Sequence, residues 1–349
     1  MKKSKLKMIG ILGLFWFITA VSFPGTICAA PADWPKTISI AAARVGTGNY
    51  NLSAGMGELI TKYLGVKSVP EASSVGGKTL HLMNRKEVEF AVSFSDQAFD
   101  AARGIGNYKT YGKMNVRQMW MGTVAPFAMI ARADSDIGTV AELRGRKVMG
   151  IYPGNMSFTK IMDLFLESEG MTRNDIKDIS FTGWKEGSAA VKEKRVAAFI
   201  HPMPSEGMAG WLKQVSMEAK LRLFAVDEDK IDAIVKKYPY LMKCKLYAKY
   251  YGDMTLNKDL VTMSPINSMF CRSDLPESLV YSVMKTVFDH LDELYPYHKD
   301  VKSWTDNPLY PAVVPYHPGV IKYWKEKGRW TPELDALQKK LLAEVGASK

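Results

Sequence analysis

Two glycine-containing loops hold the residue types that bind small anions. The first is Gly46-Thr47-Gly48-Asn49-Tyr50, and the second is Pro153-Gly154-Asn155-Met156-Ser157. Each precedes a predicted helix, whose first backbone N–H groups and dipole attract negative charge. Small hydroxyls add directional hydrogen bonds, and Tyr50 can close over an apolar part of a ligand. The alternative is a purely structural role, in which the glycines only permit tight turns and Ser157 only caps a helix.

Charged residues near these loops add further candidates. Arg44 and Lys78 can each form an ion pair with a carboxylate, which an arginine grips through two bonds. Asp96 can bind an ammonium group, but capping the following helix, Gln97 to Arg103, is the more common role of an aspartate and the one we expect. Among the five histidines, His201 is the one expected to face a ligand.

The sequence provides no catalytic or metal constellation. It has no H-x₃-H spacing, no Cys/His cluster, no G-x-S-x-G elbow and no G-x-x-x-x-G-K-[ST] loop. We therefore expect a protein that is not an enzyme and that uses no cofactor and no metal. After the N-terminal segment there is no basic run long enough for a nucleic-acid arm.

The first thirty residues resemble a secretory signal peptide. A basic head with four lysines and no acid precedes the uncharged run Met8 to Phe23, which is shorter than the ~20 residues that span a bilayer, and small residues follow up to Ala30. Cleavage would lower the formal charge of +11 by those four lysines, to +7. The alternatives are an uncleaved anchor and, less favoured because bulky Ile27 precedes it, a lipid attached at Cys28. A periplasmic location follows from the favoured interpretation, in which Cys244 and Cys271 could pair or stay free.

The elements that position these loops alternate between strand and helix. Two rounds of strand, loop and helix, joined by extended crossovers near 124–132 and 245–270, predict two α/β lobes with hinge strands, in the manner of a type II periplasmic binding protein. We assign 33–126 plus 250–349 to domain I and 127–249 to domain II. Predicted strands are 38–42, 69–73, 90–94, 127–131, 147–151, 179–182, 197–200, 221–226 and 261–272. Predicted helices include one around 56–64 that Gly65 ends, 78–86, one from Ser157 to Gly170, 276–294, 318–327 and 332–345.

Several short motifs recur in an order that resembles the TAXI family, the solute-binding receptors of one branch of tripartite (TRAP) transporters. Besides the two loops, they are Ala91 to Asp96, Lys237-Tyr238-Pro239-Tyr240, Tyr251-Gly252, Ser273 to Glu277 and Pro315 to Gly319. In the last of these motifs, the match to the family's His-Pro-Gly implies a structural role for His317. The resemblance implies a periplasmic receptor that closes around a small carboxylate, commonly glutamate or a related dicarboxylate, and delivers it to a membrane permease driven by an ion gradient. The expected ligand-binding residues are Arg44, Gly46, Thr47, Gly48, Asn49, Tyr50, Ser74, Phe94, Ser95, Gly154, Asn155, Met156, Ser157, His201 and Tyr251.

The chain departs from the family pattern at positions that would touch a ligand. Phe94 replaces a polar residue, Asn155 a serine and Met156 a glycine, and the family's Tyr-Tyr pair is reduced to Tyr50-Asn51. These changes predict a narrower and more apolar cleft, which suits a more apolar carboxylate. The alternative function, which shares the fold, is the ligand-sensing subunit of a membrane signalling system.

Overall fold

A computed structural model describes residues 31–73, 78–204, 206–305, 309 and 312–346. The predicted signal peptide, Cys28 and Ser74 lie outside the described residues, as does the side chain of Lys78. No helix within the described part of the chain is long and apolar enough to cross a membrane.

Lobe I is built on a six-stranded sheet in the order β10-β11-β3-β1-β2, with β4 also paired to β11. Strand β1 is parallel to both of its neighbours, β2 and β3. Strand β11 is antiparallel to β3, β4 and β10. The strands are β1 (Thr37–Ala42), β2 (Lys67–Ala72), β3 (Phe90–Phe94), β4 (Val116–Val124), β10 (Leu241–Leu246) and β11 (Leu260–Arg272). The helices are α1 (Gly48–Leu64), α2 (Lys78–Asn84), α3 (Ser95–Arg103), α9 (Glu277–Asp289), α10 (Pro318–Glu326) and α11 (Pro332–Val345).

Lobe II is built on a five-stranded sheet in the order β7-β6-β8-β5-β9. Strand β6 is parallel to β7 and β8, and β5 is antiparallel to β8 and β9. The strands are β5 (Phe127–Arg132), β6 (Lys147–Ile151), β7 (Lys177–Ser180), β8 (Ala198–Pro202) and β9 (Leu221–Phe224). The helices are α4 (Met156–Ser168), α5 (Trp184–Lys192), α6 (Gly210–Glu218), α7 (Glu228–Lys237) and α8 (Ala248–Tyr251).

Short 3₁₀ helices complete the described elements. They are η1 (Gly106–Tyr108), η2 (Ala141–Leu143), η3 (Arg173–Asp175), η4 (Gly252–Thr255), η5 (Leu291–Leu294) and η6 (Lys299–Thr305).

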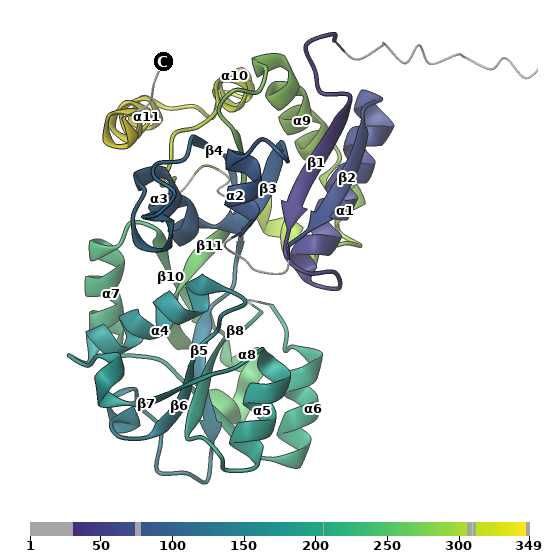
Figure 1. The fold of residues 1–349 in the computed structure, drawn as a ribbon. Coiled ribbons are helices and arrows are strands. Elements are labelled where there is room, and N and C mark those ends of the chain that lie inside the picture. The colour runs from purple at the N-terminus through teal and green to yellow at the C-terminus, as the bar shows by residue number, and fades with distance from the viewer. Residues whose placement is uncertain (1–30, 74–77, 205, 306–308, 310–311, 347–349) are drawn as a thin grey trace, which may run out of the picture.

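The two lobes are stacked end to end and joined by extended chain (Figure 1). Strand β4 ends at Val124 and β5 begins at Phe127, so the first crossing is direct. The return crossing uses β11, whose first half pairs with β10 and whose second half pairs with β3 and β4. The predicted two-lobed α/β fold is confirmed. The division into domains at 126/127 and 249/250 stays a proposal.

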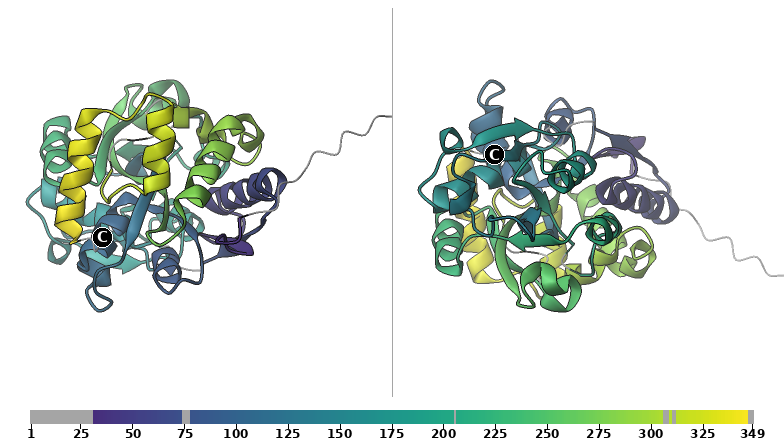
Figure 2. Two further views of the ribbon diagram at one scale, coloured as in Figure 1. Left: turned by 90° about the horizontal axis from the view of Figure 1, so that it is seen from above. Right: turned by 90° about the horizontal axis from the view of Figure 1, so that it is seen from below.

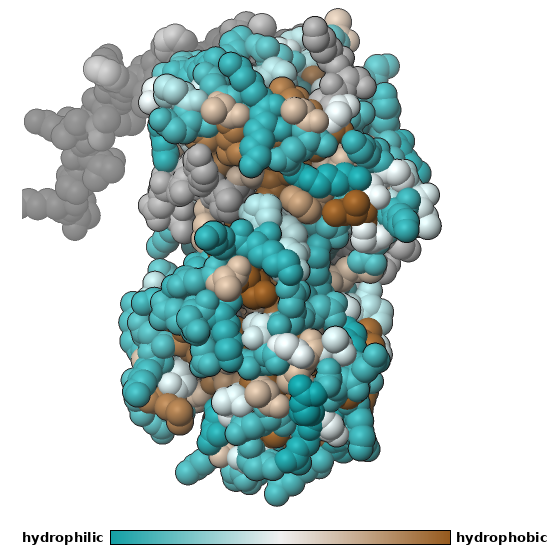
Figure 3. Space-filling view, turned by 90° about the vertical axis from the view of Figure 1, so that its left-hand side faces the viewer, coloured by the Kyte–Doolittle hydropathy of each residue, from teal (hydrophilic) through white to brown (hydrophobic). Residues whose placement is uncertain are grey.

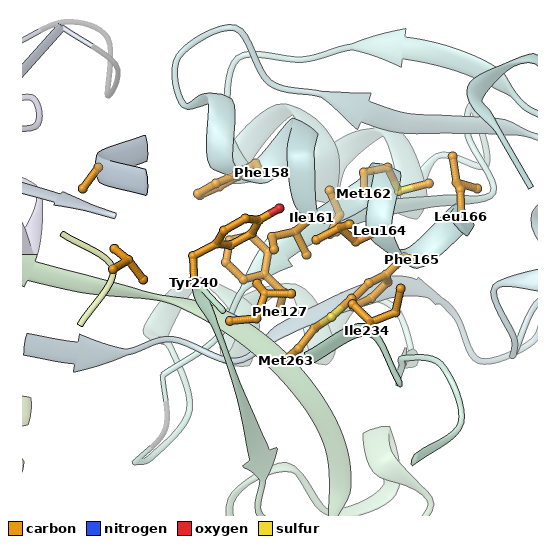
Figure 4. Packing of buried hydrophobic residues seen from close by; sticks show 14 of the residues in the cluster. Phe127, Phe158, Ile161, Met162, Leu164, Phe165, Leu166, Ile234, Tyr240 and Met263 are labelled. Carbon is orange, nitrogen blue, oxygen red and sulfur yellow. The ribbon is translucent and has the colours of Figure 1, made fainter. Parts of the chain in front are cut away.

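Helix α4 shows how sequence periodicity builds the core of lobe II. Its apolar positions Phe158, Ile161, Met162 and Phe165 are buried on one face, as predicted from their spacing. They pack against Phe127 of β5, Ile234 of α7 and the return segment that carries Tyr240 and Met263 (Figure 4). The same buried cluster continues into lobe I through residues such as Ala98 and Phe270, so the apolar interior is continuous between the lobes.

Two C-terminal helices cover lobe I, and one face of the molecular surface is mostly hydrophilic. Seen from above, the yellow helices α10 and α11 lie over lobe I (Figure 2). The face shown in Figure 3 is mostly hydrophilic, and its hydrophobic patches are small and separate. The large apolar side chains are thus concentrated in the interior, where Trp120, Phe127 and Phe165 are fully buried.

Several local predictions are confirmed by the backbone. Gly65 ends α1 with a φ of 68°, and Pro318 and Pro332 lie in the first turns of α10 and α11. His317 is buried and caps α10 by accepting from the backbone N–H of Gly319, so its structural role is confirmed.

Other local predictions are wrong. Asn155, not Ser157, caps α4. Helix α3 begins at Ser95, so Asp96 lies within its first turn and gives no side-chain cap. The predicted helix 276–294 ends at Asp289, because His290 adopts φ −129° and ψ 35°, and continues as η5.

Cys244 and Cys271 are free thiols. Cys244 pairs with Thr262 across β10 and β11, whereas Cys271 lies nine residues farther along β11. Because a strand rises about 3.3 Å per residue, the two positions are far beyond the reach of a disulfide. The structure therefore shows that Cys244 and Cys271 do not form a disulfide, an alternative that the sequence left open.

Candidate functional site

The first loop follows β1 and prepares the start of α1. Thr47 caps this helix, since its hydroxyl oxygen accepts from the N–H of Tyr50 at 3.3 Å. Gly46 has a φ of 83°, a conformation that favours glycine. Within the described residues the N–H groups of Gly48 and Asn49 have no hydrogen-bond partner, as is usual for the first turn of a helix.

Arg44 connects this loop to lobe II. Its side chain is largely exposed, and its Nη2 donates to the phenolic oxygen of Tyr152 at 2.8 Å. Tyr152 directly follows β6 and opens the second loop. The two loops singled out in the sequence are therefore brought together across the lobes.

The second loop prepares the start of α4. The side-chain oxygen of Asn155 accepts from the N–H of Ser157 at 3.1 Å, and it also accepts from the amide of Gln97 in lobe I at 3.3 Å. Gly154 lies against the ring of Tyr152, which a Cβ at that position would approach to 3.1 Å. Met156 is half-buried at the first position of the helix.

The first turns of α3 and α4 meet in a buried polar contact. The hydroxyl of Ser157 donates to the carboxylate of Asp96 at 2.7 Å and accepts from Gln97 Nε2 at 2.9 Å. Burial raises the pKa of Asp96 from 3.8 to about 6, although the charge of Lys160 and the bond from Ser157 oppose that shift. Ser157, which we expected to contact a ligand, is thus hydrogen-bonded to two residues of lobe I.

One turn along both helices, an ion pair extends this contact. Lys160 Nζ lies 2.9 and 2.8 Å from the two carboxylate oxygens of Asp100, and 4.3 Å from the centre of the Tyr240 ring. We call Asp96, Gln97, Asp100, Asn155, Ser157 and Lys160 the α3–α4 cluster. It holds the lobes together by polar bonds between two helices that belong to different lobes.

A second group of residues lines the lobe I side near α1. Asn49 donates through Nδ2 to Asn267 of β11 at 3.3 Å. A Cβ on Gly48 would lie 2.7 Å from the ring of His298, so a side chain at this position would displace that ring. Tyr50 is half-buried in the first turn of α1.

On the lobe II side, aromatic rings form a continuous row, which we call the aromatic band: Tyr152, Phe158, His201, Trp211 and Trp184. Successive ring centres lie 4.8, 5.6, 5.2 and 5.1 Å apart along this order. Phe158 is buried, whereas the other four rings are half-buried. Phe181 and Phe199 support the band from the interior.

His201 is neutral at physiological pH. Its Nδ1 donates to the carbonyl of Pro202 at 2.7 Å, and burial lowers the pKa of the ring from 6.5 to about 4. The residue is therefore a polar ring within an aromatic surface rather than a positive charge.

Three other expected ligand contacts are used within the protein. The hydroxyl of Ser95 donates to the carbonyl of Tyr240 at 2.7 Å and accepts from the N–H of Ile266 at 2.8 Å. Tyr251 is buried in lobe II and donates to the carbonyl of Pro204 at 2.7 Å. Phe94 is buried at the end of β3. All three hold the elements around the site in place.

A cavity of about 360 Å³ lies in lobe II away from the two loops. It is lined by Arg132, Asp134, Ser135, Asp136, Ile137, Arg146, Lys147, Lys194, Arg195, Val196 and Ala197. Arg132 and Arg146 are paired with Asp134 and Asp136, so part of its positive charge is neutralised. We place the candidate site at the two loops because residues of both lobes meet there. Across the described residues, no group of three His, Cys, Asp or Glu side chains could hold a metal ion.

The sequence model of the NMT1-like family matches residues 40–328. The chain belongs to the NMT1-like family. The match includes both loops, the α3–α4 cluster and the aromatic band, so the candidate site lies entirely inside the region that defines this family.

One solved structure shows the fold of this NMT1-like protein in another protein, and two further structures are similar to it at lower TM-scores. A protein of Xanthomonas citri, solved with a chloride ion bound, has a TM-score of 0.52 and 10% identity and covers 89% of this chain and 98% of its own. The aliphatic sulphonate binding protein SsuA of Escherichia coli has a TM-score of 0.46 and 13% identity, with 88% of each chain covered. SsuA of Xanthomonas axonopodis pv. citri, bound to MOPS, has a TM-score of 0.47 and 16% identity, with 89% and 96% covered. At such identities the likeness concerns the fold alone.

Sequence reasoning missed several residues of this site in the NMT1-like chain. Gln97, Lys160 and Asp100 join the lobes, but only the tertiary structure brings their helices together. Trp184 and Trp211 carried a usable signal, because each lies at the start of a helix that follows a strand of the second round.

Proposed function

We propose that this protein is a periplasmic solute-binding receptor that captures a small anion between its two lobes and delivers it to a membrane permease. The observation that carries the proposal is the meeting of the two loops, in which Arg44 of lobe I touches Tyr152 of lobe II at 2.8 Å. The two-lobed fold and the family membership support it. The protein binds its ligand and does not transform it.

The anion would be held by groups at the starts of two helices. The guanidinium of Arg44 provides positive charge on lobe I. The N–H groups of Gly48 and Asn49, which have no hydrogen-bond partner among the described residues, provide donors there. From lobe II, Tyr152 accepts the hydrogen bond from Arg44, and Met156 begins α4 next to the capping Asn155. A ligand that touches both loops stabilises the arrangement in which the lobes are close, by its higher affinity for that arrangement.

The finer assignment rests on the sequence motifs. The TAXI resemblance favours a TRAP permease as partner, and the apolar replacement Met156 favours a carboxylate more apolar than glutamate. Export through cleavage near Ala30, and the domains 33–126 plus 250–349 and 127–249, belong to the same proposal.

Thermal unfolding in the presence of small acids tests the function. We expect an acid that fits to stabilise the protein by about 2.7 kcal/mol at a hundredfold excess over its dissociation constant, because it binds the folded state only. The panel comprises C4–C6 dicarboxylates, acidic amino acids, branched aliphatic acids and ring-bearing acids. Mass spectrometry of ligand released from the purified protein identifies a natural one.

Two matched arginine variants locate the site. Arg44→Met removes the charge at the loops and is expected to weaken the binding of a stabilising acid by about tenfold or more. Arg195→Met removes an exposed arginine, paired with Glu193, that lines the other cavity, and it should leave binding unchanged. If no acid raises the melting temperature, the anion receptor is wrong. If Arg195→Met alone weakens binding, the ligand occupies the other cavity.

A further inference from the structure

The aromatic band is placed where a ligand between the lobes would touch it. Tyr152 directly follows β6, His201 lies in β8, and Trp184 and Trp211 lie in the first turns of α5 and α6. These positions belong to the carboxyl ends of the parallel strands β6, β7 and β8, the edge at which open α/β sheets bind ligands. The contact of Arg44 with Tyr152 shows that this edge faces lobe I.

The aromatic band differs from an ordinary aromatic core because most of its rings are incompletely buried. Tyr152, His201, Trp184 and Trp211 are half-buried, while Phe158, Phe181 and Phe199 behind them are buried. Trp184 and Trp211 differ in this respect from the core tryptophans Trp120 and Trp304, which are 0% and 2% exposed. Trp184 and Trp211 therefore form a partly exposed aromatic surface, which Phe199 supports through its ring contact with Trp211.

The chemistry of the band favours a flat ring over an aliphatic chain. Trp184 and Trp211 are stacked with an interplanar angle of 19°, and His201 adds a neutral ring 5.2 Å from Trp211. Faces of this kind attract other π-systems beyond the effect of buried area alone. Positive groups lie at both ends of the row, since Arg44 contacts Tyr152 and the ammonium of Lys185 lies 5.6 Å from the Trp184 ring.

We infer that the ligand is an anion that carries a flat, unsaturated ring, with the ring against the aromatic band and the negative charge at Arg44 and the start of α1. This inference rests on the proposed function and names the ligand class of the same site. It explains why the loop of lobe II carries a tyrosine and a methionine beside its helix start, where a dicarboxylate would gain from further polar groups.

Matched pairs of acids test the ligand class by titration calorimetry. Benzoate is compared with cyclohexanecarboxylate, and phenylacetate with cyclohexylacetate, so that charge and size are kept and only the unsaturation of the ring changes. We expect the aromatic acid of each pair to bind about three- to tenfold more tightly. Binding should also change the tryptophan fluorescence of the protein.

Variants in the band separate stacking from folding. Trp184→Leu and Trp211→Leu should reduce the preference for the aromatic acid to about one, while Trp211→Phe should keep most of it. Tyr111→Leu, an exposed aromatic residue between α3 and β4, is the matched control and should change nothing. Because each preference is a ratio measured within one variant, partial loss of active protein does not affect it.

The outcomes distinguish this inference from the proposed function. Equal affinity for both acids of each pair, or an unchanged preference in both leucine variants, overturns the ring-bearing ligand while the anion receptor stands. If aliphatic dicarboxylates bind tightly and the ring-bearing acids do not bind, the ring-bearing ligand is likewise overturned and the anion receptor stands. If no acid of either panel binds, the receptor function fails and the inference fails with it.

Discussion

Asp96 has an environment that differs strongly from that of a free side chain. It is a carboxylate with 2% exposure in the first turn of α3, bonded to Ser157 and close to Asp100 and Lys160. Its raised pKa means that the folded protein keeps the proton up to about pH 6, while the unfolded chain releases it near pH 3.8. The native state therefore loses stability from this residue as the pH rises from about 4 to about 6, and the loss is complete above that range.

The pH dependence of stability is expected to change in Asp96→Asn. The asparagine keeps the shape and can accept the bond from Ser157, but it does not titrate. We expect the free energy of unfolding of the natural protein, relative to the variant, to fall by on the order of 3 kcal/mol between pH 4 and pH 7. Urea unfolding of both proteins between pH 4 and pH 7 measures this difference in the free energy of unfolding. If the free energies of the two proteins change with pH in the same way, the raised pKa of Asp96 is contradicted.

At the residue scale the sequence predicted which loops matter but not what each side chain does. Thr47 and Asn155 lie in loops whose composition predicted helix starts, and both cap helices. The partner of Asp96 could not be predicted, because Ser157 is 61 residues away and lies in the other lobe. The internal bonds of Ser95 likewise depend on Tyr240 and Ile266, which only the folded chain brings near.

At the scale of elements, the N-terminus of α4 has two tasks. Asn155 satisfies the backbone of its own helix and accepts a bond from Gln97 of lobe I. An N-cap that served the helix alone would affect stability only. This one also fixes the position of α4 relative to α3, and with it the distance between the two loops.

Two N-cap variants separate these tasks. Asn155→Ala and Thr331→Ala, the second at the start of α11, should each lower the free energy of unfolding by about 1 kcal/mol. Only Asn155→Ala should also weaken the binding of a stabilising acid, by about three- to fivefold, because α11 is remote from the loops. Equal affinity in both variants would show that the cap acts on the helix alone.

Elements with regular patterns were predicted and elements with polar interiors were missed. Strands β3 and β6 and helix α11 have the predicted bounds, since their apolar positions repeat with the expected period. Strand β4 was missed because its interior positions include Gln118 and Thr123, whose burial depends on tertiary partners such as the carbonyl of Pro315, which accepts from the backbone N–H of Gln118 at 2.8 Å. Strand β10 was missed because lysines alternate along it.

At the scale of the whole molecule, the lobes share both an apolar cluster and the α3–α4 cluster. The ion pair between Lys160 and Asp100 is the charged part of this junction, and its side chains are 25% and 10% exposed. Removing the lysine alone leaves a mostly buried carboxylate of lobe I without its cation.

A double-mutant cycle measures this coupling between the lobes. Lys160→Met should lower the free energy of unfolding by about 2 kcal/mol, less than a fully buried pair because the lysine is partly exposed. Adding Asp100→Asn should restore at least half of that loss, since the unpaired charge is gone. If the two effects are additive in urea unfolding, the pair does not couple the lobes.

The C-terminal helices have a practical consequence for measuring how the lobes move. The chain enters lobe I at β1, and α10 and α11 return to it, with Arg103 of α3 paired to Glu344 of α11. The described chain thus starts and finishes in the same half. If the protein is tethered to a solid support near either end of the described chain, only lobe I is immobilised. A fluorescent dye on lobe II would then report the rotation of lobe II relative to the immobilised lobe I.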